Sequence, residues 1–185
     1  MKAKKSPHAK RIILKEGKFM RLVKKGKWEF AERNNCSGIV IIVAITDEKK
    51  VIFVEQYRPP VDKRVIEFPA GLVNDECYPK IESVAAAAKR ELLEETGYQA
   101  QKIIQLLEGP VSSGSSGDLV TMVLAKGLRK VSAGGGVDHD ESIIVHEINL
   151  KNVDSWLRKM EGKGYLVEPK IYTGLYFLNN YNIGH

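Results

Sequence analysis

The chain has 185 residues, of which 43% are hydrophobic and 28% charged, with a formal net charge of +6. This composition is typical of one globular domain that is large enough to fold without disulfides or a structural metal. The longest apolar run, Ile39 to Ile45, is far shorter than the roughly 20 residues of a membrane-spanning helix, so we expect a cytoplasmic protein with no membrane partner.

The positive charge is concentrated at the N-terminus. Residues 1–28 contain eleven lysines and arginines and one acid, so this segment carries +10 and the rest of the chain −4. A basic arm attracts nucleic acid or any polyanionic ligand, including a nucleoside diphosphate, and its sign alone does not distinguish them. For residues 1–10 we expect a solvated basic tail.

The first regular structure predicted is a small antiparallel sheet. The segments RIILKE, KFMRLV and KWEFAER alternate apolar and polar side chains, and Gly17 and Gly26 separate them. We therefore expect residues 11–35 to form an N-terminal β-sheet subdomain. Residues 39–57, rich in valine and isoleucine around the turn sequence DEKK, predict a buried hairpin, and the short strand VIEFP follows.

A central helix is the clearest element of the second half. Residues 80–96 are rich in alanine, leucine and glutamate, with Pro79 placed to open the helix and Gly97 to close it. Further strands are expected over residues 102–107, 119–124 and 142–148, and helices over 153–161 and 169–179. Strands around one helix, followed by two helices, favour an α+β fold, an α/β/α sandwich with a mixed sheet.

Three carboxylates share one face of the central helix. At about 100° per residue, Glu91, Glu94 and Glu95 fall within one arc, preceded by small apolar side chains that indicate a partly buried face. Like charges at this spacing cost free energy unless cations neutralise them, and Mg²⁺ prefers such oxygen ligands. The alternative is an exposed cluster paired with Lys89 and Arg90.

The sequence around this helix resembles the Nudix box of the Nudix hydrolases. In that pattern G, five residues, E and seven residues precede R-E-U-x-E-E-x-G-U, where U is bulky and apolar; EFPAG at Glu67–Gly71 and RELLEETGY at Arg90–Tyr98 match it. Ten residues instead of five separate Gly71 from Glu82, so the loop before the helix carries a five-residue insertion. The role of Glu82 therefore depends on how this longer loop closes.

The resemblance implies a Nudix hydrolase domain over residues 36–185 and a magnesium site that manganese could also fill. Its implied ligands are Glu91, Glu95 and the backbone carbonyl of Ala70, with Glu94 assisting or binding another ion. Arg90 would orient the glutamates. Such ions bridge phosphate oxygens and lower the pKa of an attacking water, which suits hydrolysis of a phosphoanhydride.

Segments outside the box resemble the branch that cleaves ADP-ribose and nucleoside diphosphate sugars. VEQYRPPV covers residues 54–61, and SSGSSGD, residues 112–118, stands where the branch usually has S-P-G-x-x-x-E, with Ser113 and Asp118 replacing the proline and the glutamate. In this branch the N-terminal sheet dimerises and stacks the base between aromatic rings of the two subunits. The substrate-binding residues implied are Phe19 and Trp28 for stacking, Glu29 for the base amino group, Arg33 and Arg58 for phosphates or the terminal ribose phosphate, Lys170 for phosphate or sugar, and Leu72 and Gly114.

Two of these residues also have ordinary structural interpretations, and the general base has several candidates. Trp28 is otherwise a core or dimer-interface tryptophan, and Arg58 otherwise forms a surface ion pair.

The branch draws its base from a loop before the last strand, where Glu141 stands and where the glycines at 134–136 would let the loop close. Asp138, Asp140, Glu94 and Glu95 are the alternatives to Glu141.

The expected activity is Mg-dependent hydrolysis of ADP-ribose or a related nucleoside diphosphate sugar by a homodimer, giving a nucleoside monophosphate and a sugar phosphate. One alternative is a Nudix hydrolase that acts on RNA 5′ ends or dinucleoside polyphosphates, although we do not expect a nucleic-acid partner. Another is a non-catalytic nucleotide sensor, but a pure binder gains nothing from three mutually repelling carboxylates.

Overall fold

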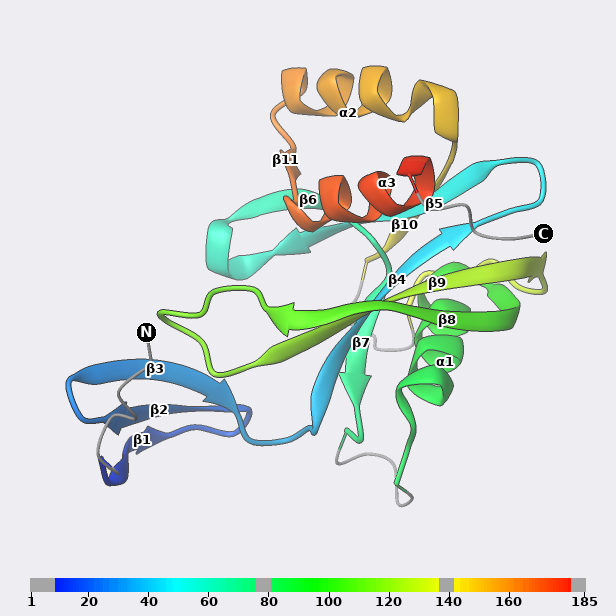
Figure 1. The fold of residues 1–185 in the computed structure, drawn as a ribbon. Helices are drawn as coiled ribbons and strands as arrows, with labels where there is room; N and C mark the ends of the chain where they lie inside the picture. The colour runs from blue at the N-terminus through cyan, green and yellow to red at the C-terminus, as the bar shows by residue number, and fades with distance from the viewer. Residues whose placement is uncertain (1–8, 76–80, 137–141, 181–185) are drawn as a thin grey trace.

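The N-terminal segment forms the small sheet that its alternating pattern predicts. The computed structural model describes residues 9–75, 81–136 and 142–180 (Figure 1). Strands β1 (Arg11–Glu16), β2 (Met20–Lys25) and β3 (Trp28–Arg33) pair antiparallel in the order β1-β2-β3. Gly26, at φ +63°, makes the turn between β2 and β3 in a conformation that disfavours side chains.

A mixed sheet forms the body of the molecule, as expected. Its strands are β4 (Gly38–Ile45), β5 (Lys50–Arg58), β6 (Lys63–Glu67), β7 (Ala70–Val73), β8 (Tyr98–Pro110), β9 (Leu119–Lys130), β10 (Ile144–Asn149) and β11 (Leu166–Val167). The order is β11-β6-β5-β4-β9-β8, with β10 paired to β5 and β7 paired to β4. The β4–β9 and β11–β6 pairs are parallel, and the others are antiparallel.

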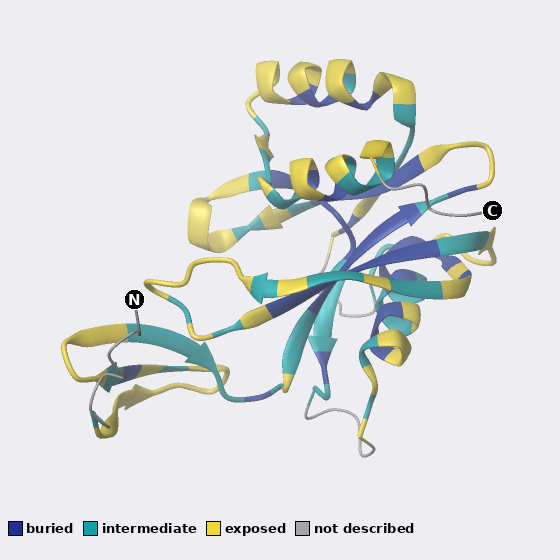
Figure 2. Ribbon diagram, viewed as in Figure 1, coloured by how far each residue is buried: buried dark blue, intermediate teal, exposed yellow. Residues whose placement is uncertain are grey.

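Helices cover both faces of this sheet. They are α1 (Val84–Thr96), α2 (Val153–Gly162) and α3 (Lys170–Asn180), with short 3₁₀ turns η1 (Pro59–Val61) and η2 (Leu150–Asn152). Because successive side chains of a strand point to opposite faces, β4 serves two cores. Ile41 and Val43 pack with α2 and α3, whereas Ile42 and Ala44 pack with α1 (Figures 1 and 2). This arrangement confirms the α/β/α sandwich.

The central helix begins later than predicted. It starts at Val84, not at residue 80, because Ser83 caps it and accepts the N–H of Ala86 on its Oγ at 3.2 Å. Pro79, which was expected to open the helix, lies outside the described residues. Gly97 ends the helix as predicted, with φ +74° and its N–H bonded to the carbonyl of Leu93 at 2.9 Å.

Some strands differ from the predicted ones in length or were not predicted. Strands β8 and β9 extend well beyond residues 102–107 and 119–124, because they pair along almost their whole lengths in a long hairpin. Strands β7 and β11 were not predicted, since four and two residues are too few to show a periodic pattern.

No helix in the described part of the chain has the length and apolar content that a membrane span requires.

The N-terminal sheet is joined to the body through the loop between β8 and β9. The backbone of Ala31 exchanges hydrogen bonds with this loop, donating to the carbonyl of Ser115 and accepting from Gly117, both at 2.9 Å. The backbone N–H of Arg33 donates to Asp118 Oδ1 at 3.0 Å. Asp118 therefore attaches β3 to the loop that resembles the S-P-G-x-x-x-E motif.

Candidate active site

Two of the glutamates predicted to bind metal pack against β7. Glu95 is only 7% exposed, and its Oε2 accepts the backbone N–H of Ala70 at 3.1 Å. The backbone at Gly71 touches Glu91 so closely that a Cβ there would lie 1.8 Å from the carboxyl carbon of Glu91. The structure therefore brings Glu91 and Glu95 together with Ala70, at the interface of α1 and β7.

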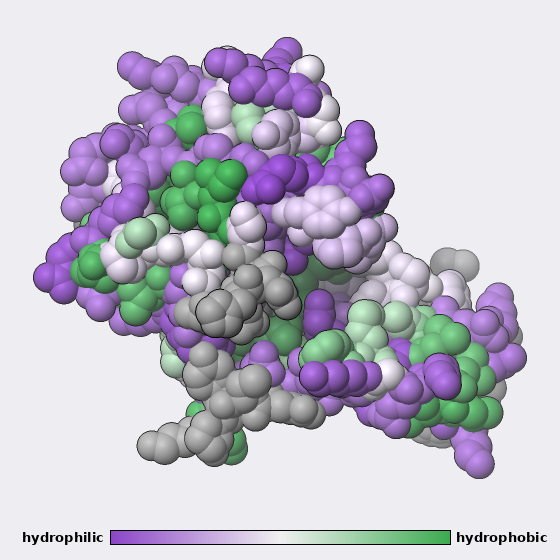
Figure 3. Space-filling view, turned by 180° about the vertical axis from the view of Figure 1, so that it is seen from behind, coloured by the Kyte–Doolittle hydropathy of each residue, from purple (hydrophilic) through white to green (hydrophobic). Residues whose placement is uncertain are grey.

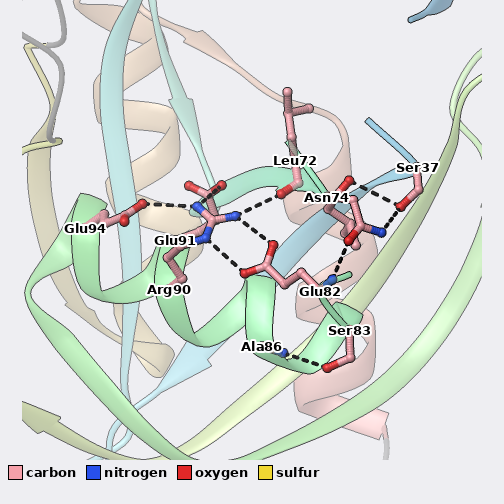
Figure 4. A network of polar contacts seen from close by, with 10 residues as sticks. Ser37, Leu72, Asn74, Glu82, Ser83, Ala86, Arg90, Glu91 and Glu94 are labelled. Carbon is pink, nitrogen blue, oxygen red and sulfur yellow. Dashed lines mark hydrogen bonds and ion pairs between the residues drawn. The ribbon is translucent and has the colours of Figure 1, made fainter. Parts of the chain in front are cut away.

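Arg90 connects the remaining polar groups of this face (Figure 4). Its guanidinium donates to both carboxylate oxygens of Glu82, at 3.0 and 3.1 Å, and to the carbonyl of Leu72 at 3.0 Å. The same group donates to Glu91 Oε1 at 2.7 Å and to Glu94 Oε2 at 3.1 Å. Arg90 thus holds two glutamates in place, and Leu72 takes part through its backbone carbonyl.

Burial makes this carboxylate face electrostatically costly. Desolvation raises the pKa of Glu91 above its usual value, although the hydrogen bond from Arg90 acts in the opposite direction. Burial alone would lower the pKa of Arg90, but its bonds to Glu82 and Glu91 raise that pKa above the ordinary value. Arg90 therefore stays charged and offsets part of the buried negative charge, as a bound cation would.

The chemistry of these donors fits a hard divalent cation. Carboxylate and backbone carbonyl oxygens are the ligands of Mg²⁺ and Mn²⁺, not of soft metals. Within residues 9–75, 81–136 and 142–180, no group of three His, Cys, Asp or Glu side chains is arranged as a metal-binding cluster. The reason is visible in the contacts: Arg90 lies between Glu91 and Glu94, while Ala70 holds Glu95. The residues fit the ion, and binding requires the glutamates to exchange these contacts for it.

The glycines at 134–136 pack against the end of α1, a contact that was not predicted from the sequence. The N–H groups of Gly135 and Gly136 donate to the carbonyls of Glu95 and Glu94, at 2.9 and 3.1 Å, and so cap the end of α1. At Gly134, with φ +72°, a Cβ would lie 2.4 Å from the carbonyl carbon of Thr96. The glycines therefore allow close packing against α1. In the sequence, the only indication of this contact is the run of three consecutive glycines.

The predicted base candidates lie just beyond these glycines. Glu141, Asp138 and Asp140 are all outside the described residues. Gly135 and Gly136, which precede these residues in the chain, contact the end of α1 that carries Glu94 and Glu95.

Trp28 and Gly114 meet at a cavity between the N-terminal sheet and the β8–β9 loop. The cavity holds about 820 Å³ and is lined by Trp28, Phe30, Arg11, Lys25 and Lys27 on one side and by Ser113, Gly114, Ser116 and Gly117 on the other, together with Ala9 and Gly26. Trp28 is 56% exposed, so it is not a core tryptophan within this chain. An exposed indole beside three cations is suited to a flat, anionic ligand.

The two predicted stacking residues lie at opposite ends of the N-terminal sheet. Met20, next to Phe19, pairs with Arg33, whereas Trp28 pairs with Lys25. Five residues of strand separate these pairs, roughly 17 Å. One chain therefore does not bring both rings to the same base. Glu29, predicted to accept from the base, forms an exposed ion pair with Lys24 at 3.5 Å.

Arg33 lies at the other end of β3, where it lines a smaller cavity of about 280 Å³ with Cys36 and Asp118. Burial raises the pKa of the Cys36 thiol above its usual value. Arg33 therefore faces the junction of the N-terminal sheet and the body.

The other two predicted cationic contacts gather around an acidic pair. Nε of Arg58 donates to Glu67 Oε2 at 2.9 Å, and Nη2 forms an ion pair with the same oxygen at 2.9 Å. Lys170 pairs with Glu168. Glu67 is 8% exposed; burial raises its pKa, the charge of Glu168 raises it further, and Arg58 opposes both. Arg58 thus forms an ion pair, which was the structural alternative to phosphate binding. Glu67 was not predicted as a site residue, although an acidic residue within the otherwise apolar strand VIEFP could have indicated it.

Comparison with known proteins shows which family this chain resembles. Residues 37–130 match the NUDIX domain. The chain is 36% identical to the methanol dehydrogenase activator of Bacillus methanolicus over 73% of its own length and 65% of that protein, and 36% identical to the ADP-ribose pyrophosphatase of Bacillus subtilis (strain 168) over 62% and 60%. It thus spans less than two thirds of either relative.

A solved structure extends the comparison to almost the whole chain. The crystal structure of an ADP compounds hydrolase superposes with a TM-score of 0.68 and 17% identity, over 94% of this chain and 91% of that one, which shows a shared fold. The matched domain contains β4 to β9 and α1 with its glutamates, which is the part of the chain that builds the site. This chain belongs to the Nudix family.

Proposed function

We propose that this protein hydrolyses the diphosphate bond of ADP-ribose or a related nucleoside diphosphate sugar, with Mg²⁺ or Mn²⁺ as cofactor. The observation that carries the proposal is the packing of Glu91 and Glu95 of α1 against Ala70 and Gly71, with Arg90 directed at the glutamates. Membership of the Nudix family supports the reaction class. Similarity to an ADP-ribose pyrophosphatase supports the substrate class.

In this proposal the chain's own residues prepare the diphosphate for attack by water. Glu91, Glu95 and the carbonyl of Ala70 would hold the ion, and Glu94 would assist. When bound, the ion neutralises phosphate charge and lowers the pKa of the water. Glu141 accepts the water proton, with Asp138, Asp140, Glu94 and Glu95 as the alternatives. The water oxygen bonds to one phosphorus, and the bridging oxygen leaves with the other phosphate.

Substrate specificity is assigned to residues outside the box. Trp28 stacks on the base beside the 820 Å³ cavity, with Phe19 supplied by a second subunit and Glu29 accepting from the base. Arg33, Arg58 and Lys170 bind phosphate or the terminal sugar, which requires Arg58 and Lys170 to exchange their contacts with Glu67 and Glu168. Gly114 and Leu72 border the substrate through their backbone.

A substrate panel tests the proposed reaction. We expect the purified chain with Mg²⁺ to cleave ADP-ribose or another nucleoside diphosphate sugar into two phosphate monoesters, detected by phosphatase release and chromatography. Dinucleotides, dinucleoside polyphosphates, flavin substrates and capped RNA complete the panel. Preferential cleavage of capped RNA would overturn the substrate class, and binding without any cleavage would replace the hydrolase by a nucleotide sensor.

We further propose that the protein is a homodimer assembled through the N-terminal sheet. Ile12 and Leu14 of β1 are 47% and 44% exposed, and Met20 and Leu22 of β2 are 43% and 41% exposed. Figure 3 shows hydrophobic surface over this sheet. Adjacent exposed apolar side chains indicate a protein interface. The separation of Phe19 from Trp28 within one chain supports the same arrangement.

Ile12→Glu is expected to convert the dimer into monomers. Ile12 pairs with Lys24 and so lies on the same face as Leu22 and Met20, where a glutamate places a charge in the apolar contact. Sedimentation velocity measures the result. Val131→Glu is the control, since Val131 is 45% exposed but lies outside the N-terminal sheet. A wild-type chain that sediments as a monomer, or an Ile12→Glu dimer of unchanged stability, would contradict the proposed interface.

A further inference from the structure

The longer loop between Gly71 and Glu82 raises a physical problem. Five additional residues separate Gly71 from Glu82, and Glu82 must be placed accurately to pair with Arg90. The structure nevertheless has both carboxylate oxygens of Glu82 on the guanidinium of Arg90, at 3.0 and 3.1 Å. The backbone at Glu82 therefore requires a contact that fixes it independently of the loop between.

Asn74 supplies that contact (Figure 4). Its Oδ1 accepts the backbone N–H of Glu82, and its Nδ2 donates to Ser37 Oγ at 2.7 Å. Ser37, at the start of β4, in turn donates from its backbone N–H and its hydroxyl to the carbonyl of Val73, at 2.9 and 3.3 Å. One carboxamide thus joins the end of β7, the start of β4 and the residue that holds Arg90.

The backbone of Asn74 is suited to this role. It adopts φ +54°, in the left-handed region that asparagine tolerates better than most residues. In this conformation the chain turns out of β7 directly after Val73. The hydrogen bond to Glu82 then closes the inserted loop at its base, so that Asn74 and Glu82 bracket the insertion.

We propose that Asn74 is a positioning residue for the metal site, acting through Glu82 and Arg90 on Glu91 and Glu94. The path has three steps, each a direct contact: Asn74 to the N–H of Glu82, Glu82 to the guanidinium, and the guanidinium to the two glutamates. Groups that orient metal ligands from outside the coordination sphere typically change metal affinity about 10- to 100-fold when removed. The inference rests on the proposed metal-dependent function.

The test uses the full chain freed of metal, with Mn²⁺ as the probe. Asn74→Gly removes the carboxamide and keeps the backbone free to adopt positive φ, and it is expected to weaken Mn²⁺ binding about tenfold in calorimetry. Lys49→Gly is the matched control, because Lys49 also has positive φ, at 62°, but lies in the β4–β5 turn. Asn74→Asp keeps the acceptor for Glu82 and is expected to retain most of the affinity.

A second readout needs no metal. The Nε–H of Arg90, bonded to Glu82, is expected to give a protected NMR resonance in wild type and in Lys49→Gly, identified by its loss in Arg90→Lys, and to exchange faster in Asn74→Gly. If Asn74 acts through Glu82, the double variant with Glu82→Gln binds Mn²⁺ no more weakly than Glu82→Gln alone.

The possible outcomes separate this inference from the proposed function. If wild type binds no divalent ion, the metal-dependent function fails, while the Arg90 resonance still tests the contact path from Asn74. If wild type binds Mn²⁺ and Asn74→Gly binds it equally well with an unchanged Arg90 resonance, Asn74 has no positioning role and the proposed function stands. Additive effects in the double variant would also overturn the path through Glu82.

Discussion

Glu95→Gln is expected to lower kcat with the preferred substrate on the order of 100- to 1,000-fold, the range observed when one group that stabilises transition-state charge is removed. Glu95 is nearly buried beside Ala70, so it lies within the site and not on a solvated helix face. The amide keeps an oxygen that accepts the N–H of Ala70 but carries no charge for a cation. We therefore expect the fold to persist while the metal-dependent step is lost.

Steady-state kinetics and thermal unfolding measured side by side check this result. Glu161→Gln on α2 is the control, since Glu161 is an exposed helical glutamate far from β7 in the sequence and outside the carboxylate face. Turnover within a few-fold of wild type for Glu95→Gln would remove Glu95 from the metal site. A loss of turnover accompanied by a large fall in Tm would instead assign Glu95 a structural role.

Gly71→Ala is expected to have a comparably large effect on activity with a small effect on folding. A Cβ at residue 71 would lie 1.8 Å from Cδ and 2.0 Å from Oε1 of Glu91, far inside van der Waals contact. The atoms in the way belong to the end of a flexible side chain, so Glu91 can rotate aside and the backbone can stay. The substitution then displaces the carboxylate of Glu91, one proposed metal ligand, and leaves the fold intact.

The expected results for Gly71→Ala are an activity at least about 100-fold lower, weaker Mn²⁺ binding and a Tm close to wild type. Gly38→Ala is the matched control, because Gly38 pairs with Val73 at the far end of β7 and a Cβ there meets nothing within 4 Å. Wild-type Mn²⁺ affinity in Gly71→Ala would mean that Glu91 is not a ligand. Global unfolding of Gly71→Ala would mean that the contact supports the fold.

Much of the fold was predictable from local patterns. Alternation in residues 11–33 predicted the N-terminal sheet, and helix-forming residues ending at Gly97 predicted α1. These elements carry their signals within a few turns or strand residues, where periodicity and capping act. The start of α1 was misplaced because Ser83, a side-chain cap, competed with Pro79 as the signal.

The candidate site was predictable only in part. Helix geometry placed Glu91, Glu94 and Glu95 on one face, and the resemblance to the Nudix box added Arg90. The structure brings Glu91 and Glu95 to Ala70. Glu67 was missed because its partner Arg58 lies nine residues away on a neighbouring strand, and burial of an acid shows only when strands pair. The separation of Phe19 from Trp28 likewise follows from the register of β2 and β3.

By itself the sequence determined the sandwich, the acidic helix face and the chemistry that this face can support, because each depends on residue type and short spacing. The tertiary structure alone decided how the longer loop closes, with Asn74 holding Glu82, and how the glycines at 134–136 cap α1. These contacts join residues that are separated in the sequence and meet only once the chain has folded. Hydrogen-bond partners of that kind are selected by packing and burial, which no local pattern records.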